Sequence, residues 1–215
     1  MKRRTQNILI AAALILIFLV TVAVVYAYLS DQGEKDNNFT VGNNSVEIEE
    51  DFTPPPEMHE GDNPFVKEVR VTNTGNVPCY VRAFFDFSDS EVKEKAGISK
   101  ESYEKYPDGS DNFDELHWLS FEEYLHALPD GWVYISVSDD PLLGGYFYYT
   151  ELLDVGASTE YLFKAINAHF DKETDVTDFE IIITADSVQA TDKDGKEFEG
   201  ADAWKQAWSE FLGDL

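Results

Sequence analysis

Two alternating runs flank a turn in Phe65-Val-Lys-Glu-Val-Arg-Val-Thr-Asn-Thr-Gly-Asn-Val-Pro-Cys-Tyr-Val-Arg-Ala-Phe-Phe-Asp-Phe87. The second run places Val81, Ala83, Phe85 and Phe87 on one face and Tyr80, Arg82, Phe84 and Asp86 on the other. A period of two residues is typical of strands with one buried face. Asn73-Thr-Gly-Asn76 is a turn signal between them, so the stretch predicts two strands joined as a hairpin.

The same alternation recurs along the rest of the chain. Further strands are predicted over residues 39–42, 46–49, 132–138, 145–151, 160–165 and 179–190. The last of these is the richest in β-branched residues, and we expect it to be a central strand. About eight short strands separated by turn signals predict an all-β fold, a two-sheet β-sandwich of jelly-roll or immunoglobulin-like type.

Short helical insertions and a C-terminal amphipathic helix are expected beside the sheets. Residues 88–130 are interpreted as an insertion in a sandwich domain that spans 41–215, with a long charged surface segment over 88–115. In that insertion Ser120 and Glu123 have the spacing of a capping box at the start of a short helix. Near the C-terminus Ala203, Trp204, Ala207, Trp208 and Phe211 recur at helical spacing and form one apolar stripe, which we expect to dock on a sheet.

The composition excludes some partners. Asp and Glu number 42 against 16 Lys and Arg, a net charge of −26. Such a surface repels nucleic-acid phosphates and anionic lipid, and it favours solubility, cations or basic partners. Cys79 is the single cysteine, so an intramolecular disulfide is impossible; its apolar neighbours predict a small buried side chain.

Residues 1–27 have the pattern of an export leader. Lys2-Arg3-Arg4 precedes an uncharged apolar run from Ile8 to Leu29, and Val25-Tyr-Ala27 predicts signal-peptidase cleavage between Ala27 and Tyr28. The run is also long enough to cross a bilayer, so an uncleaved signal anchor is the alternative. Either form places residues 28–215 outside the cytoplasm, with membrane contact only through the leader.

No residue pattern in the sequence indicates a catalytic, cofactor or metal site. The four histidines (His59, His117, His126 and His169) form no zinc motif, and no phosphate-binding or nucleophile-elbow motif is present. Calcium is conceivable at the acidic loops 108–115 and 192–194, but neither has the twelve-residue spacing of a calcium loop. The sequence therefore predicts that the protein is not an enzyme.

The chain is also rich in aromatic residues, which make up 14% of it. Tyr146-Phe-Tyr-Tyr149 places rings on both faces of one strand. An exposed face made by Tyr146 and Tyr148 would be a candidate surface for stacking on sugars or binding protein. Core packing on both faces is the other interpretation.

Several short motifs resemble the TasA/camelysin (CalY) family of Gram-positive bacteria. They are Val25-Tyr-Ala-Tyr-Leu-Ser-Asp31, Asn38-Phe-Thr-Val-Gly42 leading into Val46-Glu-Ile48, Val71 to Arg82, Gly145 to Tyr149, Asp154 to Thr159 with Leu162-Phe163, and Ile183 to Ala190. The similarity covers most of the chain, and the leader with its Ser-Asp start is the most specific part.

The resemblance implies a jelly-roll-like sandwich exported through a SipW-type signal peptidase. It also implies a secreted subunit, extracellular or on the cell surface, that polymerises with itself into biofilm matrix fibres. The segment freed by cleavage, residues 28–40, would be a flexible donor strand, with Tyr28, Leu29, Phe39 and Val41 as its candidate apolar contacts. Strand addition to an open sheet edge is the physical basis of such assembly.

Three functional hypotheses follow. The first is the fibre or matrix subunit, with itself and other matrix proteins as partners. The second is a cell-surface adhesin or binding module that uses exposed aromatics for a glycan or a host protein. The third is a metallopeptidase-like hydrolase, because some family members are so classified; this chain lacks the zinc motif, and the activity is not carried over.

Overall fold

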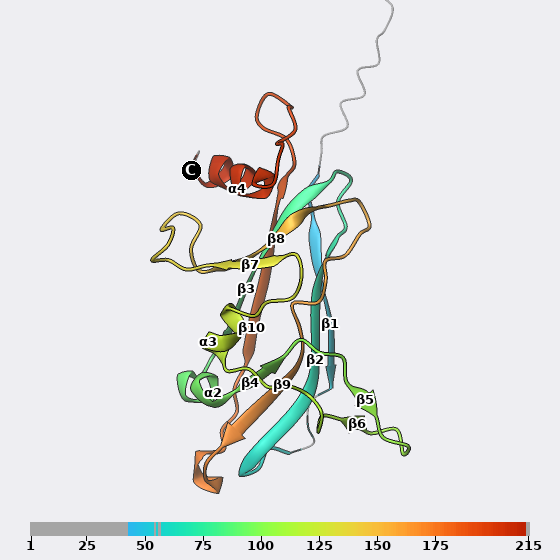
Figure 1. Cartoon of the computed structure of the whole chain (residues 1–215), viewed down its shortest axis with the longest axis vertical. Helices are drawn as coiled ribbons and strands as arrows, with labels where there is room; N and C mark the ends of the chain where they lie inside the picture. Colours follow the sequence, from blue (N-terminus) through green and yellow to red (C-terminus); the bar gives the residue numbers. More distant parts are fainter. Residues whose placement is uncertain (1–42, 54, 56, 214–215) are drawn as a thin grey trace, which may run out of the picture. The chain divides into compact units, whose positions relative to one another are not determined.

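The computed structural model describes residues 43–53, 55 and 57–213, and it confirms the predicted β-sandwich. Two four-stranded antiparallel sheets pack together, with short helices and a C-terminal helix beside them (Figure 1). The leader, the cleavage site at Ala27 and Tyr28, the segment 28–40 and the predicted strand 39–42 lie outside the described residues.

The first sheet has the order β1-β2-β9-β4. Its strands are β1 (Val46–Thr53), β2 (Gly61–Asn73), β9 (Phe163–Phe170) and β4 (Gly97–Ser99). The register of β2 against β9 shifts between Val66 and Val69, so β2 carries an extra residue there. Such a bulge bends a strand and increases its twist.

The second sheet has the order β10-β3-β8-β7. Its strands are β10 (Ile181–Gln189), β3 (Cys79–Phe87), β8 (Tyr146–Leu153) and β7 (Trp132–Ile135). The prediction that β10 is central is wrong, because β10 pairs with β3 and ends the sheet. β-Branched residues favour an extended backbone, but they do not determine how many neighbours a strand has.

The predicted hairpin is also wrong, because β2 and β3 belong to different sheets. The turn between them crosses from one sheet to the other. Asn73 closes it: its side-chain amide donates to the carbonyls of Val77 (2.9 Å) and Leu153 (3.0 Å). Gly75 is required at the crossing, because a Cβ there would collide with the carbonyl oxygen of Asn43.

The insertion after β3 contributes to the core, contrary to the expectation of a surface segment. It contains α2 (Ser90–Lys95), β4, the small hairpin β5 (Glu104–Lys105) and β6 (Asp111–Asn112), and α3 (Phe121–Leu125). Val92, Ile98 and Tyr124 are buried among the core residues. The capping box of Ser120 and Glu123 is confirmed at the start of α3.

The main core lies between the sheets. Phe85 is at its centre, with its ring centroid 4.5 Å from that of Phe163 and 6.3 Å from that of Phe147. The four inward residues predicted for β3 are all buried. Cys79 is fully buried as predicted, and burial raises the pKa of its thiol to about 11. A thiol in this state is a packing group.

A second core cluster covers the outer face of the second sheet. The predicted C-terminal helix, α4 (Ala203–Gly213), packs there with Trp204 and Trp208 on Tyr148. Figure 1 shows α4 near the upper end of β10. Phe211, the last residue of the predicted stripe, is 49% exposed. Between β9 and β10 lies one 3-10 turn, Glu173–Asp175. None of the described helices is long and apolar enough to cross a bilayer.

Candidate functional site

The candidate aromatic surface of β8 does not form. Tyr148 is fully buried, and its ring lies 5.3 Å from that of Trp204 and 5.8 Å from that of Trp208. Its hydroxyl donates to the carbonyl of Leu143 (2.6 Å). The interpretation of Tyr148 as part of an exposed aromatic face is wrong, because α4 covers this side of β8. The alternation within a strand does not reveal which other element packs on it.

Tyr146 is only partly buried and contributes to a different arrangement. The Arg82 guanidinium lies 3.9 Å from its ring centroid and 4.5 Å from that of Trp208, and it forms an ion pair with Asp186 at 3.0 Å. Cations favour aromatic faces when they are removed from water. Tyr146 therefore helps to hold Arg82 against α4.

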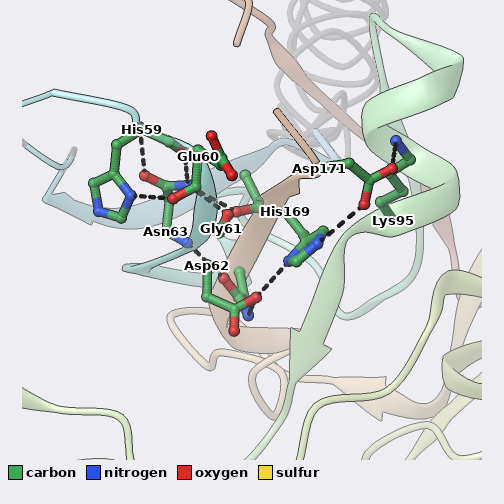
Figure 2. Close-up of polar contacts among 10 residues, drawn as sticks. His59, Glu60, Gly61, Asp62, Asn63, Lys95, His169 and Asp171 are labelled. Atoms are coloured by element: carbon green, nitrogen blue, oxygen red, sulfur yellow. Dashed lines mark hydrogen bonds and ion pairs between the residues drawn. The ribbon is translucent and has the colours of Figure 1, made fainter. Parts of the chain in front are cut away.

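The histidines do not converge on a common centre in the described part of the chain. His169 Nδ1 is 2.8 Å from Asp62, and its Nε2 is 3.3 Å from Asp171, which Lys95 also contacts (Figure 2). The two carboxylates lie on opposite sides of the imidazole, so they cannot share a metal ion with it. His59 Nδ1 bonds instead to the Glu60 carbonyl.

This network predicts a pH dependence of stability. The hydrogen bond to Asp62 raises the pKa of His169 above its usual 6.5. Because the pKa of His169 is higher in the folded than in the unfolded chain, its protonated form stabilises the fold. This contribution is fully present below about pH 6.5 and is lost as the pH rises through the pKa of His169 in the folded state.

We expect His169→Gln to lower the urea midpoint near pH 5.5 and to have less effect near pH 8.5. The loss at acid pH should be only about 0.3 to 0.5 kcal/mol, because the side chain is 39% exposed and its ion pairs are screened by solvent. Urea titrations of both proteins at the two pH values check this. An equal loss at both would mean that the imidazole acts by packing and not by charge.

The acidic loops bond to their own backbone. Asp108 accepts from the amide (3.0 Å) and hydroxyl (2.6 Å) of Ser110, and Asp192 accepts from the amides of Asp194 (2.9 Å) and Lys196 (2.8 Å). No group of three or more His, Cys, Asp or Glu side chains in the described ranges is placed to hold a metal ion. The calcium and hydrolase interpretations gain no support from these loops.

In the described part of the chain, the flank between the edge strands β1 and β10 is incompletely closed. The half-buried apolar side chains that pack against the main core from these two edge strands are Val46, Ile48, Ile181, Ile183 and Ala185. Two cavities lie along the flank. The Asn44 cavity, about 370 Å³, is lined by Asn44, Ser45, Val46, Arg82, Ala185, Asp186, Ser187 and Phe211.

The Lys67 cavity, about 560 Å³, lies at the other end of the flank. Its lining is Phe52, Pro55, Glu57, Met58, Phe65, Lys67, Thr177, Asp178, Phe179, Glu180 and Ile181. Both cavities are lined by residues of the first sheet's β1 or β2 and of the second sheet's β10.

The free side of β10 presents backbone groups outward. The Ser187 carbonyl accepts from the side-chain amide of Asn44 (3.1 Å), so it points away from β3, whereas the Glu180 carbonyl accepts from the Ser88 amide on the β3 side (2.9 Å). Backbone direction alternates along an antiparallel strand. The residues with outward groups are therefore Ile181, Ile183, Ala185 and Ser187.

Sequence reasoning missed an ion pair inside this flank. Lys67 shares the inward face of β2 with Phe65 and Val69, and it forms an ion pair with Glu50 of β1. The alternation of the stretch Phe65 to Thr72 places Lys67 on its apolar face. The sequence therefore already indicated that this lysine points inward. Inward charges are a known means of keeping an edge from uncontrolled pairing.

Comparison with known proteins gives no assignment, since no family model and no curated protein matches the chain.

Proposed function

We propose that this chain is an exported structural protein, a subunit of a biofilm matrix or surface fibre that assembles by strand addition. The observation that carries the proposal is the incompletely closed flank with the free edge of β10. Within the described residues, β10 pairs with β3 alone. A nine-residue edge of this kind is a template for a strand from another copy.

Backbone and side chains would both contribute to the contact. An added strand could bond to the outward groups of Ile183 and Ala185, each net hydrogen bond contributing about 1 kcal/mol. Its inward side chains would cover the half-buried edge residues of β1 and β10, removing apolar surface from water. The backbone bonds supply affinity, and the covered side chains fix the register.

The donor in this proposal is the segment 28–40 with Val41, freed by a SipW-type peptidase at Ala27 and Tyr28. Phe39 and Val41 alternate with Thr40, so both would face the same side of an added strand. The resemblance to TasA/camelysin proteins supports this choice. The subunit would then be secreted, extracellular or at the cell surface of a Gram-positive bacterium, with itself as its main partner.

The test is filament formation by the exported protein. N-terminal sequencing should show Tyr28 as the first residue, and electron microscopy of the same sample should show filaments. Deletion of residues 28–40 should abolish them, because the donor strand is removed.

A matched pair of substitutions isolates the role of the side chains. Phe39→Ser with Val41→Ser should prevent assembly, whereas Thr40→Ser should not, since only the first pair loses the apolar face. A protein that stays monomeric at high concentration with the correct N-terminus would refute the proposal. So would filaments formed equally well by the deleted chain.

A further inference from the structure

The Lys67 cavity has the dimensions and lining of a binding site. Its volume of about 560 Å³ lies within the usual range for ligand pockets. Phe52, Met58, Phe65 and Phe179 supply apolar walls, and Phe52 is 47% exposed. An apolar group placed here would cover rings that the fold itself leaves in contact with water.

The charge at the inner end of the cavity is already neutralised. The Lys67 side chain is 8% exposed, forms an ion pair with Glu50, and has its ammonium 4.4 Å from the Phe52 ring centroid. Burial lowers the pKa of Lys67 to about 8. Because Glu50 balances this cation, the inner end of the cavity does not require an anionic ligand.

The rim of the cavity has the opposite character. Glu57, Asp178 and Glu180 are exposed carboxylates, and none of them forms an ion pair with another described residue. Three carboxylates around an apolar opening favour a group that carries positive charge outside and apolar surface inside.

We propose that the Lys67 cavity binds a partner polypeptide through one apolar side chain flanked by basic residues. The apolar side chain enters between Phe52 and Phe179, and the flanking basic groups meet the carboxylates of the rim. The proposed donor segment of a second copy is a poor occupant of this cavity, because residues 28–41 carry three carboxylates and one lysine. The partner is therefore a different, basic polypeptide. The cavity lies at the Ile181 end of β10, whereas the proposed donor strand bonds at Ile183 and Ala185.

The chain offers a specific probe for this site. It has two methionines, Met1 and Met58, and only Met58 lines the cavity. The full chain labelled with ¹³C in the methionine methyl groups would be titrated with capped tripeptides, at a concentration where it is monomeric. The peptides are Lys-Phe-Lys, Glu-Phe-Glu and Lys-Ser-Lys, each acetylated and amidated.

Lys-Phe-Lys should shift the Met58 signal in a saturable way, whether or not Met1 has been removed with the leader. Glu-Phe-Glu lacks the charge match and Lys-Ser-Lys lacks the apolar group, so neither should saturate. Added salt should weaken the binding, since exposed charges are screened.

Matched variants test the rim. Asp178→Asn with Glu180→Gln should weaken Lys-Phe-Lys binding by about fivefold, the effect of two exposed ion pairs. The control, Glu122→Gln with Asp154→Asn, removes two exposed carboxylates elsewhere and should not change it. An unmoved Met58 signal, equal binding of Glu-Phe-Glu, or equal loss in the control would overturn the proposal. Because the chain is monomeric in this assay, filament formation can fail while this binding holds.

Discussion

Replacing Ala185 by proline is expected to stop filament growth while leaving the subunit folded. The Ala185 amide points away from β3, so proline removes no hydrogen bond from the β10–β3 ladder. Proline does remove the hydrogen bond that the Ala185 amide would donate to the proposed donor strand. The proline ring also obstructs the approach of that strand. Proline is tolerated in edge strands where the amide that it lacks would have faced away from the neighbouring strand.

The expected size of this effect is large. Loss of one hydrogen bond contributes about 1 kcal/mol, and the steric obstruction adds to it, so the critical concentration for assembly should rise at least about tenfold. Sedimentation of filaments over a range of protein concentrations measures the change.

Two comparisons make the result specific to the edge. Ala185→Val retains the amide and should assemble as the unmodified chain does. A urea midpoint for Ala185→Pro close to that of the unmodified protein would show that the fold is intact. Normal assembly of a folded Ala185→Pro variant would place the assembly contact elsewhere.

Trp208→Ala is expected to destabilise the protein by about 3–5 kcal/mol. Trp208 is fully buried, packs against Tyr148 and Trp204 in the second core cluster, and lies beneath the Arg82 guanidinium. Removing the indole leaves a cavity under α4 and takes away an aromatic face on which the buried cation rests. Urea unfolding followed by circular dichroism measures the loss.

The indole N–H offers a finer test. In the described structure, Trp208 Nε1 is buried and has no hydrogen-bond partner, an arrangement that opposes folding. Trp208→Phe keeps most of the ring and removes this polar atom, so it should destabilise the protein much less than alanine does. Phe211→Ala, which truncates the exposed end of the same stripe, should change stability by less than about 1 kcal/mol. Equal losses for alanine and phenylalanine at position 208 would contradict this interpretation.

Local patterns were enough for several features of the fold. Alternation in β3 identified which side chains face the core, and the pair Ser120 and Glu123 marked the beginning of α3. The spacing of Trp204 and Trp208 predicted a helix with a buried stripe. These features depend on residues close in sequence, for which the periods of helices and strands set the geometry.

The position of each element in the fold required the tertiary structure. The sequence predicted a hairpin at Asn73, yet the bonds from its side chain to Val77 and Leu153 direct the chain into the other sheet. It predicted a central strand in β10, which lies at an edge. It left Tyr148 as a candidate surface residue, which α4 buries. Each of these outcomes depends on a partner distant in the sequence.

The sequence by itself determined that this is an acidic chain of half-buried strands with one amphipathic helix near its C-terminus. Only the tertiary structure decided that β1 and β10 leave a flank of the sandwich incompletely closed, with Lys67 buried there and paired with the exposed Glu50. The reason is physical: alternation specifies which face of a strand is apolar, whereas an open edge arises from the order in which strands pair.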